Sequence, residues 1–170
     1  MAPGTKATKS NETAIPLTSA ERVELYRTMV EIREFEEQVQ RSYLEGLVHG
    51  TTHLCNGHEA VSAGVAKALR PDDYLSYTYR GHGHCLARGM DAEAAFAELF
   101  GRETGVCGGL GGSMHLTDID KGLIGAFGIV GAGLPVAVGA PYRRSLPARS
   151  RSASVSSVTA PPTSAPSTKP

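Results

Sequence analysis

The amino-acid sequence predicts an α/β protein with helices near its N-terminus and a C-terminal tail of different composition. Three observations support this: an amphipathic helical pattern from residue 18, a tyrosine-rich segment at 72–79, and a glycine-rich stretch at 101–139. Helices that alternate with extended segments are typical of α/β folds. We divide the chain into residues 1–17, 18–140 and 141–170, and only the middle part has the composition of a packed domain.

The first 17 residues are rich in Lys, Thr, Ser and Pro and contain no apolar run. A signal peptide has an apolar central region and a transit peptide is rich in Arg, so neither is expected here. We expect residues 1–17 to form a disordered segment.

The first helix is predicted to begin after Thr18, because Thr18 followed by Glu21 forms a capping box. Gly46 and Gly50 end the helical pattern. Apolar residues recur between these limits every three or four positions, at Leu25, Met29, Ile32, Phe35, Val39 and Tyr43, with Val23, Tyr26 and Val30 widening the stripe.

A second helix is predicted over 59–69, ending before Pro71, and a third over 91–100 with Asp91 as its N-cap. Between them, residues 72–79 are predicted to form a strand or an extended segment, because tyrosine favours strands.

The glycine-rich stretch from Gly101 to Gly139 holds 12 glycines. Glycine is tolerated where the backbone turns sharply or approaches another group closely. Residues 123–140 carry no charge, but their Gly and Ala content and Pro135 argue against a membrane span. We expect a buried loop that leads into a helix packed through small residues.

The formal net charge is zero, from 17 basic and 17 acidic residues, but every acidic residue lies at or before Asp120. The last 50 residues hold six basic residues and no acidic one. A neutral chain gives no support for nucleic-acid binding. The three cysteines form no disulfide framework and indicate a reducing compartment, so we expect a cytoplasmic protein.

All six histidines lie between residues 49 and 115. One hypothesis is a metal site that also uses cysteines, although no Cys-x-x-Cys is present and the spacing is poor. A second is an active site in residues 79–84, Tyr-Arg-Gly-His-Gly-His, where Arg80 offers a planar fork to a phosphate and His82 can move protons. A structural role for this Arg and His in a loop is the alternative.

Glycines 125, 128, 131 and 133 superficially suggest a dinucleotide-binding loop. Their order differs from the Rossmann fingerprint, and no strand clearly precedes them. Glycines that let a helix pack closely are an equally good interpretation.

Four motifs together resemble one family. They are GTTHLCNGHEAVSAG at 50–64, YRGHGHCLARG at 79–89, GGLGGSMHL at 108–116 and GIVGAGLPVAVGA at 128–140. In order and spacing they resemble the alpha subunit of thiamine-diphosphate-dependent 2-oxo acid dehydrogenases, the decarboxylating component of pyruvate, branched-chain and acetoin dehydrogenase complexes. The resemblance covers about residues 20–140 and implies an incomplete thiamine-diphosphate-binding domain, with a parallel sheet and flanking helices.

The resemblance also implies roles for individual residues. His53 lies near the substrate and His82 belongs to the same active-site region, so both are candidate catalytic residues. The implied cofactor contacts are Tyr79 and Arg80 on the diphosphate, Gly128, Ile129 and Val130 on the aminopyrimidine, and Ser113 and His115 in a nearby loop.

In such a family the enzyme decarboxylates a 2-oxo acid, or cleaves acetoin, and passes the acyl group to the lipoyl-lysine of an acyltransferase component. The site lies between alpha and beta subunits of an α2β2 tetramer, and the Glu that activates the aminopyrimidine comes from the beta subunit. This chain departs from the usual pattern at His58, Leu110 and Phe127, which stand where the family has Gln, Lys and Asn.

The family's Mg²⁺ ligands are missing from this sequence, because they belong to a Gly-Asp-Gly segment and a following Asn, and no Asp follows residue 120. Residues 157–170 can, however, be encoded by codons that read Gly-Asp-Gly-Ala-Thr-Asn-Ile-Gly-Ala-Phe-His-Glu-Ala one base earlier. The sequence therefore predicts a change of reading frame near residue 140 and a low-complexity, disordered tail after it. A catalytically inactive remnant of the alpha subunit is the resulting alternative to an active enzyme, and a His-rich metal-binding protein is a third hypothesis.

Overall fold

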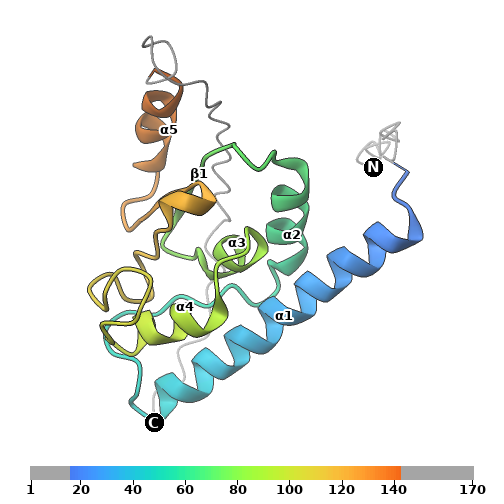
Figure 1. Ribbon diagram of the computed structural model, residues 1–170. Coiled ribbons are helices and arrows are strands. Elements are labelled where there is room, and N and C mark those ends of the chain that lie inside the picture. The colour runs from blue at the N-terminus through green and yellow to red at the C-terminus, as the bar shows by residue number, and fades with distance from the viewer. Residues whose placement is uncertain (1–15, 143–170) are drawn as a thin grey trace, which may run out of the picture.

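The computed structural model describes residues 16–142, and only the backbone of residues 141 and 142. The described elements follow the order α1 (Ser19–Leu44), α2 (Glu59–Ala68), β1 (Leu75–Thr78), α3 (His82–Ala87), α4 (Ala92–Leu99), a short 3-10 turn (Ile119–Lys121), β2 (Leu123–Phe127) and α5 (Gly133–Tyr142). The predicted disordered segments therefore lie mostly outside the described residues, although α5 continues two residues beyond the expected boundary at 140 (Figure 1).

Helix α1 begins as predicted. The Thr18 side chain accepts a hydrogen bond from the Glu21 backbone N–H, and the Glu21 carboxylate accepts one from the Thr18 N–H, which completes the capping box. The second half of the helix packs into the core through Ile32, Phe35 and Val39.

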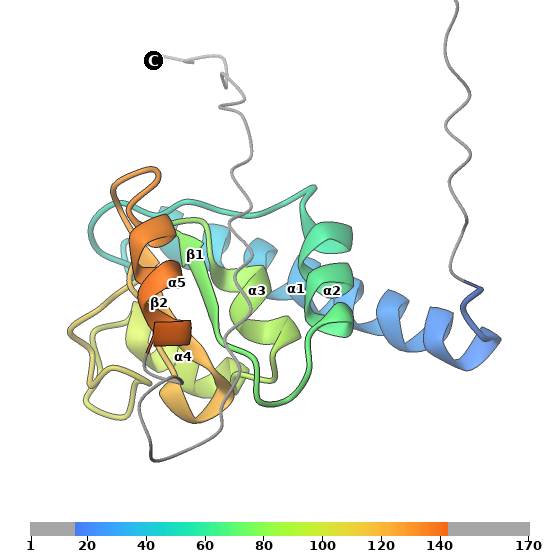
Figure 2. The same ribbon diagram turned by 90° about the horizontal axis from the view of Figure 1, so that it is seen from above.

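The N-terminal half of α1 departs from the predicted stripe. Its first turns project beyond the body of the protein (Figure 2), and Val23, Tyr26 and Val30 are exposed rather than widening the buried face. Tyr43 at the other end is also 46% exposed. An apolar period defines a face, but only packing partners bury it.

The two strands form a parallel pair in the order β1-β2, with Tyr77 opposite Ala126 and Thr78 opposite Phe127. The connection between them contains α3, α4 and the glycine-rich loop, because parallel strands cannot be joined by a tight turn. Helix α5 lies against the sheet, where the Ser76 hydroxyl donates to the Gly133 carbonyl at 3.3 Å, while α1, α2 and α3 pack on one another (Figures 1 and 2).

Most predicted elements are confirmed with small changes of boundary. The second helix ends at Ala68 rather than residue 69, the extended segment 72–79 contains β1, and Asp91 caps α4 through the backbone N–H groups of Glu93 and Ala94.

One prediction is wrong, and one helix was not predicted. The uncharged segment, expected to begin as a buried loop, begins as β2, and residues 82–87, for which no helix was predicted, form α3. The cause is the same in both segments: glycines break the local pattern, but Gly83 and Gly125 lie in elements that neighbouring segments hold in place.

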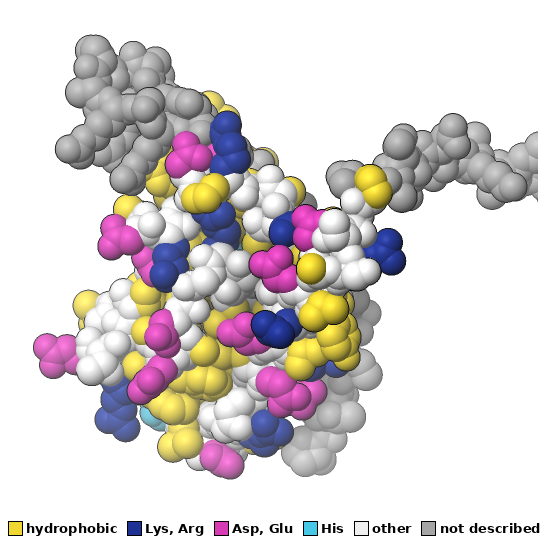
Figure 3. Space-filling view, turned by 45° about the vertical axis from the view of Figure 1, so that its right-hand side comes forward, with side chains coloured by type: hydrophobic (Ala, Val, Ile, Leu, Met, Phe, Trp, Pro, Cys, Tyr) yellow, Lys and Arg dark blue, Asp and Glu magenta, His cyan; other side chains and the backbone are white. Residues whose placement is uncertain are grey.

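Charged side chains of both signs are interspersed on the face drawn in Figure 3, and Lys and Arg do not gather there into a basic patch. Within residues 16–142, none of the helices has the length and apolar character needed to cross a bilayer.

Candidate functional site

The predicted site residues meet at the carboxyl edge of the parallel strands. Tyr79 and Arg80 follow β1, and Gly128 to Val130 follow β2, its register neighbour. The Tyr79 N–H donates to the Phe127 carbonyl at 3.1 Å and so carries the strand pairing one residue further. In parallel α/β sheets, ligands bind at this edge, because loops from adjacent strands converge there.

Arg80 is a half-buried cation at this edge. One of its N–H groups donates to the Leu54 carbonyl, which orients the guanidinium. Among the described residues, no carboxylate forms an ion pair with it. A guanidinium has five N–H donors, so a partly desolvated one without an acidic partner is suited to bind an external anion such as a phosphate.

His53 lies beside Arg80, and its ring packs on that of Tyr79 with centroids 4.4 Å apart. Burial lowers the pKa of His53, and the nearby Arg80 and His82 side chains lower it further. The ring is therefore neutral at pH 7 and can accept a proton. The neighbouring Thr52 hydroxyl is buried and has no hydrogen-bond partner among the described residues.

The glycine-rich loop is held to α4 by Glu98, which is fully buried. Its carboxylate accepts four backbone hydrogen bonds, from Cys107 and Gly109 at 2.8 Å on one oxygen and from Gly111 at 2.6 Å and Gly112 at 3.0 Å on the other. Burial raises the pKa of Glu98, but these four donors outweigh burial and keep it below its ordinary value.

Glycine is required where this loop folds back on itself. Gly109 has φ +78°, and a Cβ there would lie 2.6 Å from the Gly101 backbone and 2.7 Å from the Arg102 carbonyl oxygen. The loop therefore needs glycine for both conformation and space.

The loop delivers Ser113 and His115 to the same edge. His115 is exposed, and its Nδ1 lies 3.1 Å from the carbonyl of Ala126 in β2, so Nδ1 carries the proton and Nε2 points elsewhere. Ser113 is buried, with its hydroxyl 2.9 Å from Nε2 of His82.

His82 lies at the start of α3 with no solvent exposure. Its Nδ1 is 3.0 Å from Oε1 of Glu36, which also accepts from the Cys55 thiol at 2.9 Å. Because both ring nitrogens of His82 have partners within the chain, the structure places it beside the site edge rather than on its surface.

The order Glu36, His82, Ser113 has the hydrogen-bond geometry of a hydrolytic triad. Acyl transfer also needs access to the serine and backbone N–H groups for an oxyanion. Ser113 is 5% exposed, and the N–H groups of Gly111 and Gly112 are bonded to Glu98. Glu36, His82 and Ser113 are therefore arranged to hold the loop in position rather than to carry out nucleophilic attack by the serine.

Ile129 and Val130 are 77% and 64% exposed. They follow β2 directly, next to Gly128, whose missing side chain leaves room beside Met114 and His115. Exposed apolar side chains at a ligand-binding edge provide a surface for an aromatic ring.

Sequence reasoning missed Glu36 and Glu98 as residues of this site. A signal was available for Glu36, because it lies four positions after Ile32 on the buried face of α1. A carboxylate on an apolar stripe predicts a buried partner, since burial without one is costly. Glu98 gave the same signal between Ala95 and Leu99.

The metal hypothesis gains no support from the part of the chain that the structure describes. Within it, no three side chains of His, Cys, Asp or Glu are grouped to hold an ion. The histidines have separate surroundings: His84, for example, is buried, and burial, with His58 nearby, lowers its pKa to about 4.

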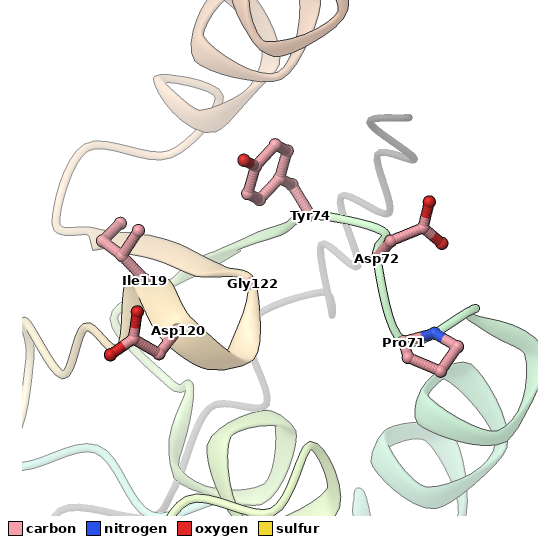
Figure 4. Close-up of a pocket in the computed structure, with 6 residues that line it drawn as sticks. All are labelled: Pro71, Asp72, Tyr74, Ile119, Asp120 and Gly122. Carbon is pink, nitrogen blue, oxygen red and sulfur yellow. The ribbon is translucent and has the colours of Figure 1, made fainter. Parts of the chain in front are cut away.

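A shallow pocket of about 220 Å³ lies at the opposite, amino edge of the sheet. Pro71, Asp72 and Tyr74 line it from the segment before β1, and Ile119, Asp120 and Gly122 from the turn before β2 (Figure 4). None of the predicted site residues borders this pocket. We therefore locate the candidate site at the carboxyl edge, where the side chains that can bind an anion and move a proton lie.

Comparison with known proteins shows the family to which the chain is similar. A family model described as "Dehydrogenase E1 component" matches residues 27–155. The alpha subunit of acetoin:2,6-dichlorophenolindophenol oxidoreductase from Bacillus subtilis is 46% identical over 125 residues, which cover 74% of this chain and 38% of that protein. The subunit of the same name from Cupriavidus necator is 41% identical over 136 residues, which cover 80% and 41%.

A third relative is the chloroplastic pyruvate dehydrogenase E1 component subunit alpha-3 of Arabidopsis thaliana. It is 43% identical over 133 residues, covering 78% of this chain and 31% of the relative. The chain thus spans about two fifths or less of the length of these relatives.

Proposed function

This chain belongs to the dehydrogenase E1 component family, a thiamine-diphosphate-dependent family, and from that premise we propose that it forms the diphosphate-binding part of an alpha subunit. The whole enzyme would decarboxylate a 2-oxo acid, or cleave acetoin, and pass the acyl group to lipoyl-lysine. The observation that supports this most is Arg80, a half-buried guanidinium without an acidic partner among the described residues, at the carboxyl edge of the parallel strands.

The donor set at this edge fits thiamine diphosphate. Arg80 and Tyr79 would bind the diphosphate, because Arg80 supplies charge and forked N–H donors and the Tyr79 hydroxyl a further donor. Gly128, Ile129 and Val130 would hold the aminopyrimidine through backbone groups and apolar contact. When bound, the cofactor supplies a thiazolium carbon that acts as nucleophile and electron sink.

The chain's own side chains would then orient the cofactor and the substrate and move protons near them. His53, kept neutral, would hold or move a proton near the substrate. His82, with no solvent exposure, would act on the site through Ser113 rather than by touching the substrate, and the exposed His115 would face the cofactor.

Magnesium and the partners belong to the proposal as well. Mg²⁺ would neutralise charge on the diphosphate, but its protein ligands would have to come from the Gly-Asp-Gly segment and the following Asn that this sequence lacks. A beta subunit would complete an α2β2 tetramer and supply the activating Glu, and a lipoyl-bearing acyltransferase would accept the acyl group. We place the protein in the cytoplasm, since its three cysteines are free.

We also propose that the tail from about residue 141 is translated out of its ancestral frame, although the family model matches as far as residue 155. The support is the run of thirteen family-like residues in the shifted reading of codons 157–170. The nucleotide sequence tests this directly: third bases that do not give Gly-Asp-Gly in the shifted frame would refute it.

The functional test compares this chain with a frame-restored chain expressed together with a beta subunit. We expect the 170-residue chain to bind thiamine diphosphate with Mg²⁺ more weakly than a Kd of about 1 mM in calorimetry, because the metal ligands are missing. The restored pair should turn over pyruvate or acetoin only when the cofactor is present.

Arg80→Ala in the restored pair should weaken cofactor binding by about a hundredfold, since it removes about 3 kcal/mol of charge-assisted hydrogen bonding. Arg102→Ala, an exposed arginine outside the site, is the matched control and should leave binding unchanged. Cofactor-independent activity, or equal affinity in both variants, would contradict the proposed function.

A further inference from the structure

A buried carboxylate that the proposed function does not use lies under the site edge. Glu36 in α1 and His82 in α3 both have 0% solvent exposure. The Nδ1 of His82 is 3.0 Å from Oε1 and 3.2 Å from Oε2 of Glu36, so the imidazole faces the whole carboxylate. An isolated carboxylate in this position would be costly, because burial removes it from water.

The partners of His82 determine where its ring protons lie. Nε2 is 3.1 Å from the carbonyl oxygen of Ser113 and 2.9 Å from the Ser113 hydroxyl. A carbonyl and an ionised carboxylate can only accept, whereas the Ser113 hydroxyl can donate or accept. A neutral ring with its proton on Nδ1 could accept from that hydroxyl, but it would face the Ser113 carbonyl with a lone pair and leave the fully buried Glu36 carboxylate without a countercharge. A doubly protonated ring donates to both acceptors and neutralises the carboxylate.

The remaining groups around the pair are consistent with a cation facing an anion. Oε1 of Glu36 accepts from the thiol of Cys55, whose pKa is raised by burial first and by Glu36 second, so that this sulfur keeps its proton. Each carboxylate oxygen and each ring nitrogen thus has a partner, and the buried pair has no net charge.

We propose that Glu36 holds His82 as a doubly protonated ring, and that this buried ion pair is a positioning element that anchors Ser113 and the glycine-rich loop to α1. Glu98 fixes the middle of the loop from α4, and the ion pair fixes its end. The ion pair forms within this chain and needs no cofactor. Only its role in positioning the loop for the cofactor rests on the proposed function.

The cation on His82 has a consequence at the surface. The charged groups near His53 are Arg80 and His82, and both disfavour a second proton on its ring. Arg80 and His82 thereby help to keep His53 neutral, and His82 does so from outside the site. Glu36 and His82 are positioning residues, because neither reaches the surface where substrate would bind.

The decisive measurement is the ¹⁵N NMR spectrum of the histidine rings in the wild-type chain at pH 7, with the His82 ring assigned as the one missing from His82→Asn. We expect both ring nitrogens of His82 to carry protons that exchange slowly with water. A neutral His82 ring, protonated at either nitrogen alone, would overturn the proposal. This signature requires no cofactor, so it is independent of thiamine diphosphate binding, whose failure would count against the proposed function and not against the ion pair.

A matched pair of variants tests the anchoring. Glu36→Gln keeps the shape and removes the charge, so the His82 ring should lose one proton and the Ser113 and Met114 amides should exchange at least about tenfold faster. Glu34→Gln, an exposed position of the same helix, should change neither. Unchanged loop exchange in Glu36→Gln would refute anchoring, and if that variant does not fold, the wild-type spectrum still decides whether the ion pair exists.

Discussion

Replacing Glu98 by Gln should destabilise the glycine-rich loop far more than the loss of one charge suggests. The fully buried carboxylate accepts two backbone N–H groups on each oxygen. An amide in its place turns one of these oxygens into a donor, so two N–H groups, either those of Cys107 and Gly109 or those of Gly111 and Gly112, lose their acceptor.

The size of the effect follows from that count. Each buried donor left without an acceptor costs about 1–3 kcal/mol, so two cost about 2–6 kcal/mol. The remaining two hydrogen bonds also weaken, because they are no longer charge-assisted. We expect a loss of about 3–5 kcal/mol, a large part of the roughly 5–15 kcal/mol that stabilises a typical domain.

Amide hydrogen exchange and urea unfolding measure this loss. In Glu98→Gln the four amides of residues 107, 109, 111 and 112 should exchange about a hundredfold faster, since 3 kcal/mol corresponds to slightly more than two powers of ten. Glu93→Gln, in the exposed first turn of the same helix, should cost about 0.3–1 kcal/mol and leave the loop unchanged.

Acid provides a second test of Glu98. Because its pKa is lowered in the folded chain, its contribution is present above its ordinary value of 4.5 and is lost as the pH falls through the folded pKa. Glu98→Gln should lack this acid-dependent part. Loop exchange within about threefold of wild type would show that the four hydrogen bonds do not hold the loop, and the reasoning would be refuted.

Two further predictions concern α2 and α3. Because burial lowers the pKa of His84 to about 4, the unfolded chain binds a proton that the folded chain excludes, so the free energy of unfolding should fall by about 3 kcal/mol between pH 6.5 and pH 4. His84→Gln should remove this slope in urea titrations while the exposed control His49→Gln retains it, and an unchanged slope in His84→Gln would contradict the assignment. Gly83→Ala should cost about 1–3 kcal/mol in thermal unfolding, because its Cβ would lie 2.7 Å from the Ser62 hydroxyl, whereas Gly64→Ala, in open space on α2, should stabilise by about 0.5–1 kcal/mol. Equal effects of the two glycine variants would show that the α2–α3 contact is not close-packed.

Local sequence signals predicted the helices well. The capping box at Thr18, Pro71 after the second helix, and the N-cap Asp91 each act within a few residues, and the elements form where these signals place them. Four ordered motifs also identified the family, because the glycines and charged residues of a site keep their spacing even when their contacts are not visible in the sequence.

Local patterns failed where distant segments decide the structure. β2 contains Gly125, and α3 begins with alternating His and Gly, so neither has a strong propensity of its own. β2 exists because it pairs with β1, and α3 exists because it packs against α1 and α2. Such elements are stabilised by tertiary contacts rather than by intrinsic preference.

The sequence by itself determined the family, the main helices, and the residue types available for anion binding and proton transfer. Only the tertiary structure decided how those residues are used: Arg80 lies at the strand edge without an acidic partner among the described residues, His82 is buried against Glu36, and Glu98 lies beneath the glycine-rich loop. The reason is physical. Burial and hydrogen-bond partners set the charge state and accessibility of a side chain, and both come from segments remote in the sequence.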